Sequence, residues 1–223
     1  MYQELVLNND PKSIISETIR TLRTNLQFAS VDKKIKTILI TSSVPGEGKS
    51  FIAANLACAF AQSGSRVLLV DCDIRKGRQH YIFNSHNKSG LSNLLLENVK
   101  EKYMDYIQET RIKNLSVMFR GVTPPNPSEL LGSSKNKELI EILRNEYDIV
   151  IFDSAPINGG LTDSIIMSTL VDGVVVVSSC KETPISLLNN TKKSLQNVNA
   201  NILGVVLNRA SSKSKKYYGH YYG

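Results

Sequence analysis

A glycine-rich stretch, Ser43-Val-Pro-Gly-Glu-Gly-Lys-Ser50, constrains the fold of this chain most strongly. An apolar, β-branched segment at residues 37–41 precedes it, and an alanine-rich apolar segment at residues 51–60 follows it. Strand, glycine loop and helix are the context of a phosphate-binding loop. The general pattern G-x-x-x-x-G-K-[ST] fits except at its first position, where this chain has Ser43. Residues 43–50 are called the phosphate loop below.

The residue types in the phosphate loop predict how it would hold a nucleotide. Gly46 and Gly48 allow successive backbone N–H groups to curl around phosphate oxygens, and the helix beginning near Lys49 would direct its positive end at the same anion. Lys49 would bring its charge from an exposed loop, and Ser50 would offer a hydroxyl to Mg²⁺. The residues expected to contact the nucleotide here are Gly46, Glu47, Gly48, Lys49, Ser50 and Phe51. The structural alternative is a glycine-rich turn that simply precedes a helix.

Acidic residues follow two further apolar runs: Asp71 and Asp73 come after the first, and Asp153 ends the second. Because ligands bind outside the carboxyl ends of parallel strands, we expect these acids to face the phosphate loop. Mg²⁺ prefers oxygen ligands, so we predict that Ser50, Asp153 and one of Asp71 and Asp73 hold it. The remaining aspartate could accept a proton from an attacking hydroxyl. Spacing does not assign these two roles, and aspartates that cap a turn are the alternative.

Strand-length apolar runs alternate with helical patterns along the chain. This order predicts an α/β fold with a mostly parallel, doubly wound sheet and right-handed crossovers. We place one domain at residues 1–210 and a disordered tail, which lacks apolar periodicity, at residues 211–223. Further strands are expected at residues 115–118, 173–177 and 202–207. Further helices are expected at residues 90–96, 135–146 and 185–198. Another helix should follow a proline-rich loop, with Ser128 as its N-cap.

An amphipathic helix is expected within residues 1–30, with Asp10 as its N-cap. Its apolar residues recur at helical spacing, at Ile15, Ile19, Leu22 and Leu26. Glu17, Arg20 and Arg23 lie three residues apart on the flank away from that stripe. On spacing alone, an ordinary solvated face with a local ion pair is the favoured interpretation.

The charge balance, 27 Lys and Arg against 20 Asp and Glu, gives a net charge of +7. Such an excess is compatible with nucleic acid, an anionic membrane surface or an acidic partner, but most of it is scattered, which indicates a solvated surface. No apolar run approaches the roughly 20 residues that span a bilayer, and no signal peptide is recognisable, so we expect a cytoplasmic protein. Three cysteines are expected to be reduced and buried: Cys58, Cys72 and Cys180.

Tyrosines are concentrated at the C-terminus. Four of the 9 tyrosines fall in the tail, at Tyr217, Tyr218, Tyr221 and Tyr222. A disordered segment gains nothing from buried aromatic rings, so we expect these side chains to have a chemical role.

Together these motifs resemble the bacterial tyrosine kinases, the cytoplasmic autokinases of capsule and exopolysaccharide export, within the MinD/ParA-like branch of P-loop ATPases. The markers are the phosphate loop as Walker A, residues 67–75 as the second acidic motif (Walker A′) and residues 149–153 as Walker B. Residues 124–131, the Glu17, Arg20 and Arg23 motif and the terminal tyrosines complete a set that covers nearly the whole chain. Ser43 agrees with the family, as does the lack of an extra early lysine. Walker B departs from the usual Asp-Thr-Pro-Pro, but its acid and a following proline remain.

The resemblance implies chemistry that the spacing left open. ATP and Mg²⁺ would be the cofactors, and Lys49, Asp71 and Asp73 the catalytic residues. Asp71 would be the base close to Mg²⁺, while Asp73 and Asp153 would hold the metal shell. Asn208 would contact the adenine.

The resemblance also implies partners. The tail tyrosines would be phosphorylated in trans within a homo-oligomeric ring, whose subunit interface would include Glu17, Arg20 and Arg23 in place of a merely solvated face. A separate membrane protein would supply an activating cytoplasmic tail and recruit the kinase to the inner face of the cell membrane. A cognate tyrosine phosphatase would be a further partner, and nucleic acid is not expected.

Two other classes of function remain as alternatives. A partitioning or positioning ATPase of the ParA or MinD kind would explain the positive charge, but it would not explain the tyrosines and would carry the extra loop lysine. A small-molecule ligase or carboxylation enzyme can use the same fold, because fold does not fix function. An iron–sulfur reductase does not fit the cysteine positions.

Overall fold

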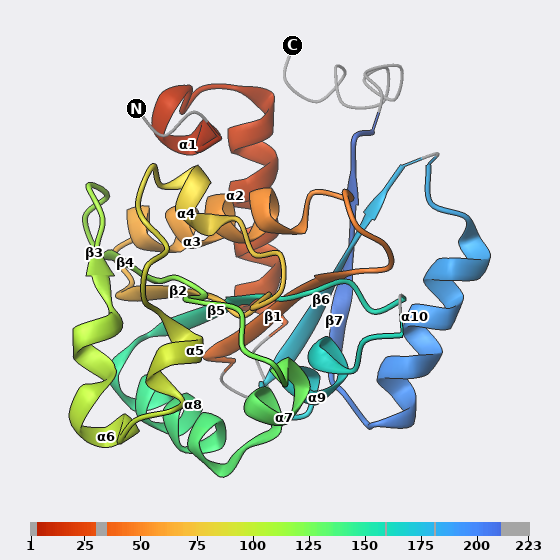
Figure 1. Ribbon diagram of the computed structural model, residues 1–223. Helices are drawn as coiled ribbons and strands as arrows, with labels where there is room; N and C mark the ends of the chain where they lie inside the picture. The colour runs from red at the N-terminus through yellow and green to blue at the C-terminus, as the bar shows by residue number, and fades with distance from the viewer. Residues whose placement is uncertain (1–3, 30–34, 159, 181, 211–223) are drawn as a thin grey trace, which may run out of the picture.

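The centre of the molecule is a seven-stranded sheet in the order β3-β4-β2-β5-β1-β6-β7 (Figure 1). This computed structural model describes residues 4–29, 35–158, 160–180 and 182–210, so the tyrosine-rich tail lies outside the described residues. The strands are β1 (Thr37–Ser42), β2 (Val67–Asp71), β3 (Gln108–Glu109), β4 (Leu115–Met118), β5 (Ile149–Asp153), β6 (Gly173–Ser179) and β7 (Ile202–Asn208). Neighbouring strands are parallel except β3 and β4, which confirms the predicted mostly parallel sheet.

Helices cover both faces of the sheet, as predicted for a doubly wound fold (Figure 1). One face carries α1 (Val6–Asn9), α2 (Ile14–Phe28), α3 (Lys49–Gln62) and α4 (Gln79–Ile82). The other face carries α5 (Leu91–Leu94), α6 (Val99–Lys102), α7 (Pro127–Gly132), α8 (Ser134–Glu146), α9 (Asp163–Ser168) and α10 (Ile185–Asn197). A 3₁₀ turn, η1 (Tyr103–Tyr106), follows α6.

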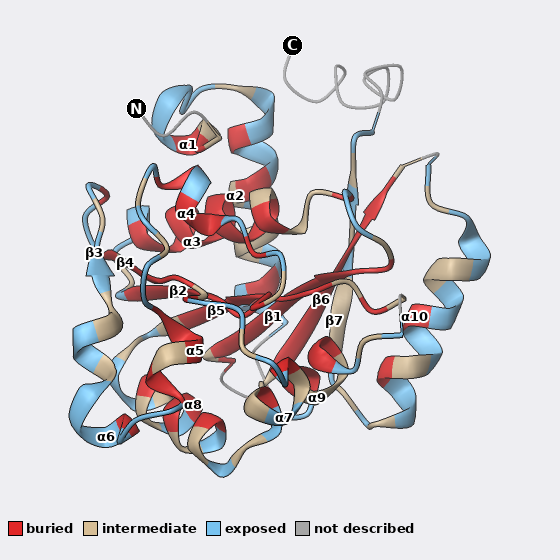
Figure 2. Ribbon diagram, viewed as in Figure 1, coloured by how far each residue is buried: buried red, intermediate tan, exposed pale blue. Residues whose placement is uncertain are grey.

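The central strands are apolar on both faces because each face has its own core. In β1, Ile38 and Ile40 pack on the side of α3, whereas Leu39 packs on the side of α8. Figure 2 shows this as burial along β1, β2, β5 and β6, interrupted only at the half-buried first residue of β5, while β7 and α10 carry many partly or fully exposed residues. The carboxyl ends of the central strands are therefore held in a rigid, dry layer.

Two predicted helix caps are wrong. Ser13, not Asp10, caps α2: its hydroxyl oxygen accepts the N–H of Ser16 at 3.2 Å, while the carbonyl of Asp10 accepts the hydroxyls of both serines. The cap of α7 is Asn126, with a proline at the first helical position, and Ser128 lies inside the helix. The contacts that cap α2 are all local, whereas the hydroxyl of Ser128 donates to Asp163 at 2.5 Å and not to the start of α7.

Other expectations need smaller corrections. Cys58 and Cys72 are buried free thiols as predicted, but Cys180 is only half-buried. In α2, Ile19 and Leu26 are buried, whereas Ile15 is exposed. In the part of the chain that the structure describes, no helix is long and apolar enough to cross a bilayer.

Candidate active site

The phosphate loop connects β1 to α3 and uses two left-handed glycines. Gly46 has φ +86° and Gly48 has φ +94°, which confirms that the predicted positions need glycine. A Cβ on Gly48 would lie 2.1 Å from Nδ2 of Asn208, so the end of β7 also excludes any larger residue there. Because the first N–H groups of a helix have no partner within it, the start of α3 at Lys49 presents donors to an anion.

The side chain of Glu47 stabilises the phosphate loop through hydrogen bonds. The carboxylate of Glu47 is buried and accepts the N–H groups of Val44 at 2.8 Å and Ser179 at 3.0 Å, as well as the hydroxyl of Thr183. The side chain of Glu47 therefore faces the loop after β6, which leaves its backbone as the part that could meet a phosphate.

Two residues at the end of β7 donate hydrogen bonds to backbone carbonyls of the phosphate loop. Asn208 donates from Nδ2 to the carbonyl of Glu47 at 2.9 Å, and Arg209 donates from its guanidinium to the carbonyl of Gly46 at 2.9 Å. Arg209 also pairs with Glu182 at 2.6 Å and has a left-handed backbone, with φ +56°. The adenine contact expected of Asn208 remains a prediction.

Ser43 has a partner that a glycine could not have. The hydroxyl of Thr191, on α10, donates to the hydroxyl of Ser43 at 2.9 Å in a buried contact. The amide of Asn158 donates in turn to Thr191 at 2.9 Å. The unusual first position of the loop thus fixes it to α10 through a hydrogen bond.

Lys49 points into the protein and not outward, contrary to the expected exposed loop. Its Nζ lies 3.2 Å from Oδ2 of Asp73 and 4.0 Å from Oδ1 of Asp153, and its side chain is 13% exposed. Burial lowers the pKa of this amine, but the charges of Asp153, Asp73 and Asp71 outweigh burial and raise the pKa overall. Lys49 is therefore a cation at neutral pH, and the acids hold it at the site.

The three predicted acids do converge at the carboxyl edge of the sheet. Asp71 and Asp153 are register partners on the adjacent strands β2 and β5, and both are fully buried. Burial raises the pKa of Asp71 well above its usual value, and the charge of Asp153 raises it further. Burial also raises the pKa of Asp153, against the opposing effects of Lys49 and of hydrogen bonds from Gln79 and Ser50. A buried cluster of three carboxylates facing one ammonium favours a further cation.

Two important residues were missed in the sequence. Gln79 is fully buried and donates to both Asp71 and Asp153. Gly77 leaves the space that Asp71 occupies, because a Cβ there would lie 2.1 Å from Oδ1 of Asp71. Neither residue belongs to a spacing pattern, and only the glycine soon after an acidic motif could have served as a signal.

The residues present fit a magnesium ion that is shared with phosphates. Oδ1 of Asp71 and Oδ1 of Asp153 are buried without a hydrogen-bond partner in the described part of the chain. In those same residues, no cluster of three His, Cys, Asp or Glu side chains is arranged to hold a metal by itself. Mg²⁺ typically takes one or two carboxylates and completes its shell with substrate phosphates and water, so both observations agree with such a site.

The Glu17, Arg20 and Arg23 face is partly occupied by contacts within the chain. Arg20 pairs with Glu17 and donates to the carbonyl of Pro11 at 2.8 Å. Arg23 donates to the carbonyl of Ala59 on α3 at 3.4 Å. The predicted local ion pair is present, and the role of this face in a subunit interface remains a prediction.

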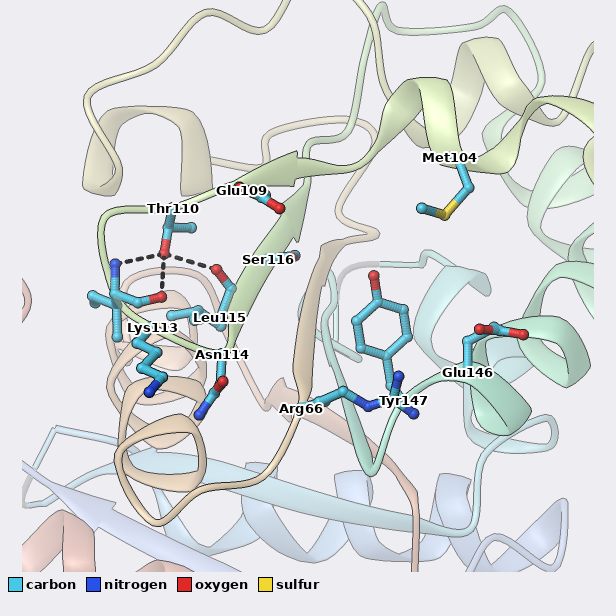
Figure 3. Close-up of a pocket in the computed structure, with 11 residues that line it drawn as sticks. Arg66, Met104, Glu109, Thr110, Lys113, Asn114, Leu115, Ser116, Glu146 and Tyr147 are labelled. Carbon is cyan, nitrogen blue, oxygen red and sulfur yellow. Dashed lines mark hydrogen bonds between the residues drawn. The ribbon is translucent and has the colours of Figure 1, made fainter.

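A separate cavity of about 480 Å³ lies at the opposite edge of the sheet, where β2, β4 and β5 begin (Figure 3). Arg66 and Tyr147 line it, together with Thr110, whose hydroxyl donates to the carbonyl of Leu115 at 2.8 Å and accepts the N–H of Ile112 at 3.0 Å. Charged side chains also line it, among them Lys113, Glu109 and Glu146, but it has no glycine loop and does not lie at the carboxyl ends of the parallel strands, where ligands bind in such sheets. We therefore place the active site at the phosphate loop.

A glycine loop after β1, a lysine at the start of α3 and acids at the ends of β2 and β5 define a P-loop ATPase of the doubly wound kind. In agreement, an AAA domain family matches residues 35–204. The cell division ATPase MinD of Pyrococcus furiosus is similar in fold, with a TM-score of 0.67 over 79% of this chain and 73% of that chain at 23% identity.

Relatives over the full length define the family more narrowly. The chain is 41% identical to a putative tyrosine-protein kinase CapB of Staphylococcus aureus, over 98% of this chain and 95% of that protein. It is also 41% identical to the tyrosine-protein kinase YwqD of Bacillus subtilis, over 99% of this chain and 92% of that protein. The crystal structure of the chimerical protein CapA2B2 superimposes with a TM-score of 0.88 at 43% identity, covering 94% and 91% of the two chains. The chain belongs to the bacterial tyrosine-protein kinases, as its motifs predicted, and not to the partitioning ATPases or ligases held as alternatives.

Proposed function

We propose that this protein is an ATP-dependent tyrosine autokinase that transfers the γ-phosphoryl group of ATP to the tyrosines of its own C-terminal tail. The observation that carries this proposal is the approach of Lys49 to Asp73 and Asp153 directly beyond the phosphate loop. Phosphoryl transfer depends on positioning and on charge stabilisation, and such a cluster supplies both. The names of the relatives, tyrosine-protein kinases, support tyrosine as the acceptor.

The chain's own residues have distinct roles in this proposal. The backbone of residues 46–51 cradles the phosphates, and Lys49 moves from the acids to the terminal phosphate when ATP binds. Ser50, Asp73 and Asp153 would hold Mg²⁺, which neutralises phosphate charge when it is bound. Asn208 would lie beside the adenine.

Asp71 would be the base for the acceptor hydroxyl. Its raised pKa suits a group that must take up a proton. Because Asp71 is fully buried and lies against Gly77, we expect that the acceptor reaches it only after a local movement of the chain around Gly77. Tyr217, Tyr218, Tyr221 and Tyr222 would be the acceptors.

Phosphorylation would occur in trans within a ring. The chain leaves the domain just after Asn208 and Arg209, both of which contact its own phosphate loop, so there is little room for the tail to fold back in line with its own ATP. A neighbour's tail can reach the site if head-to-tail contacts close a ring, and we assign Glu17, Arg20 and Arg23 to that interface.

We place this kinase in the cytoplasm, at the inner face of the cell membrane, in the regulation of capsule or exopolysaccharide export. Relatives named Wzc and EpsB support an additional partner, because this chain spans only 29% to 30% of their length. The chimerical nature of CapA2B2 supports the presence of a second protein, and we propose that this protein is a membrane protein that supplies the activating tail. A tyrosine phosphatase would reverse the modification.

Incubation with Mg-ATP followed by mapping of phosphotyrosine tests the proposal. We expect phosphate on the tail tyrosines of the native chain and none on the Lys49→Met variant. Because an activator is proposed, the assay is run with and without a peptide corresponding to the cytoplasmic tail of the proposed membrane activator. Absence of phosphotyrosine with and without that peptide, while ATP is bound, would contradict the kinase assignment.

A further inference from the structure

Gln79 is the one residue, among those that the structure describes, whose hydrogen bonds join all three nucleotide motifs. Its backbone N–H donates to Oδ2 of Asp71 at 3.0 Å. Its side-chain Nε2 donates to Oδ2 of Asp153 at 2.8 Å and to the carbonyl of Ser50 at 3.1 Å. We infer that Gln79 is a positioning residue that orients the carboxylate of Asp153 toward a bound Mg-nucleotide and holds the carboxylate of Asp71 in place beside it.

The amide selects which oxygen of Asp153 faces the site. Oδ2 is occupied by Gln79, whereas Oδ1 has no hydrogen-bond partner and is the oxygen that lies 4.0 Å from Nζ of Lys49. Without the amide, rotation of the carboxylate would interchange the two oxygens. Gln79 thus leaves one defined lone-pair acceptor for a cation at the phosphate side.

The backbone of the same residue fixes the carboxylate of Asp71. Its N–H occupies Oδ2, and Oδ1 lies against Gly77 without a hydrogen-bond partner. In each carboxylate, Gln79 donates to Oδ2, and Oδ1 has no hydrogen-bond partner in the described part of the chain.

The orientation of the amide is fixed by its neighbours. If the amide were flipped, Oε1 would face a carboxylate oxygen and a carbonyl oxygen, which are both acceptors. The rest of α4 holds the backbone in place, because Ile82 is buried in the same core as α3. Gln79 can therefore transmit a fixed geometry from α3 to the acids of β2 and β5.

Packing alone does not explain this residue. Gln79 is fully buried, yet its Oε1 has no hydrogen-bond partner in the described part of the chain. An apolar side chain of similar size would fill the space without an unsatisfied acceptor. The donors of the amide are the feature that such a side chain could not supply.

The test compares Gln79→Met, which keeps the volume but loses the amide, with the native chain. The readouts are the affinity for a fluorescent ADP with and without Mg²⁺, and kcat and KM for ATP in tyrosine phosphorylation. Removing a partner that orients a metal ligand typically costs about 10- to 100-fold. We expect Gln79→Met to lose the part of the ADP affinity that depends on Mg²⁺, with unchanged affinity in EDTA, and correspondingly to raise KM for ATP and lower kcat/KM about 10- to 100-fold.

Controls separate positioning from folding. Tyr81→Phe alters an exposed residue on the same short helix and should behave as the native chain. If Gln79→Met is insoluble, Gln79→Asn, whose shorter amide cannot span to Asp153, should show the same selective loss. A native response to Mg²⁺ in either soluble variant, or an equal loss of ADP affinity with and without Mg²⁺, would overturn the inference. Only the prediction for kcat and KM rests on the proposed function, because ADP binding is measured without an acceptor. A native chain that forms no phosphotyrosine would refute the kinase proposal, but the ADP-binding result would still test the role of Gln79.

Discussion

Nζ of Lys49 lies 3.2 Å from Oδ2 of Asp73, so the lysine expected to meet a phosphate is held by an acid. Binding of ATP then exchanges one anion for another around the same cation. The ammonium of Lys49 is therefore paired with an acid before ATP binds and with a phosphate afterwards, so it is never a buried, unpaired charge.

This arrangement predicts two effects of Lys49→Met. Phosphotyrosine should disappear, because the charge that compensates the terminal phosphate is lost. The variant should also be less stable by about 3 kcal/mol at pH 8, since removing one partner leaves buried carboxylates uncompensated. The loss should shrink as the pH falls toward the unfolded carboxyl pKa of about 3.9, because acids with a raised folded-state pKa are destabilising only when they are ionised. Thermal melts across this pH range check this, and equal melting temperatures for variant and native chain would contradict the pairing.

The two acids of Walker A′ should act differently. Asp71→Asn should lower kcat about 100-fold or more while the nucleotide still binds, because a general base is removed. Asp73→Asn should instead raise the Mg²⁺ concentration needed for half-maximal activity. Titration of Mg²⁺ against activity for both variants distinguishes the roles, and superimposable curves would mean that the division between them is wrong.

Transfer between subunits can be tested by mixing two inactive chains. One carries Lys49→Met and keeps its tyrosines, and the other keeps Lys49 but has phenylalanine at all four tail positions, 217, 218, 221 and 222. We expect phosphotyrosine on the Lys49→Met chains only in the mixture. Lack of signal at any mixing ratio would argue for transfer within one chain.

The ring interface makes a separate prediction. Alanine at both Arg20 and Arg23 should give monomers in light scattering and unphosphorylated tails. Alanine at Lys102 and Lys137 removes the same charge from exposed positions on the other face and should leave the assembly unchanged. A large oligomer that persists in the double arginine variant would remove α2 from the interface.

Asp172 should make the fold sensitive to acid. Burial alone would raise the pKa of Asp172, but hydrogen bonds from the N–H of Lys36 at 2.9 Å and from Thr37 lower it overall. A carboxylate with a lowered folded-state pKa contributes stability above its unfolded pKa of about 3.9 and loses it as the pH falls further. Asp172→Asn should therefore cost about 1 to 3 kcal/mol at pH 7 and progressively less toward pH 3.

Urea unfolding across that pH range measures the effect. Asp105→Asn alters a carboxylate that is 65% exposed and should change the unfolding free energy by less than about 0.5 kcal/mol. A gap between native and Asp172→Asn that stays constant from pH 7 to pH 3 would contradict the assigned pKa direction.

Sequence patterns predicted the parts of this protein that depend on periodicity and on strand ends. The β1, β2 and β5 runs and the acids that follow them were found because apolar residues on both faces indicate a central parallel strand. Gln79 could not be found, because its role depends on contacts with residues at positions 50, 71 and 153 that only folding brings together. The strand β3 has two exposed residues and no apolar pattern, and the inward direction of Lys49 depends on charges from other strands.

The hydrogen bonds from Asn208 and Arg209 to the carbonyls of Glu47 and Gly46 have a thermodynamic consequence. Through these bonds, residues 208 and 209, which come just before the tail, support the phosphate loop. Any force or binding event that displaces residues 208 and 209 must also change the free energy of nucleotide binding. By reciprocity, a nucleotide must bias the direction in which the tail leaves the domain by the same free energy. The tail of a subunit and the ATP bound to that subunit would then be energetically coupled, even though the phosphoryl group is transferred to the tail of a neighbouring subunit.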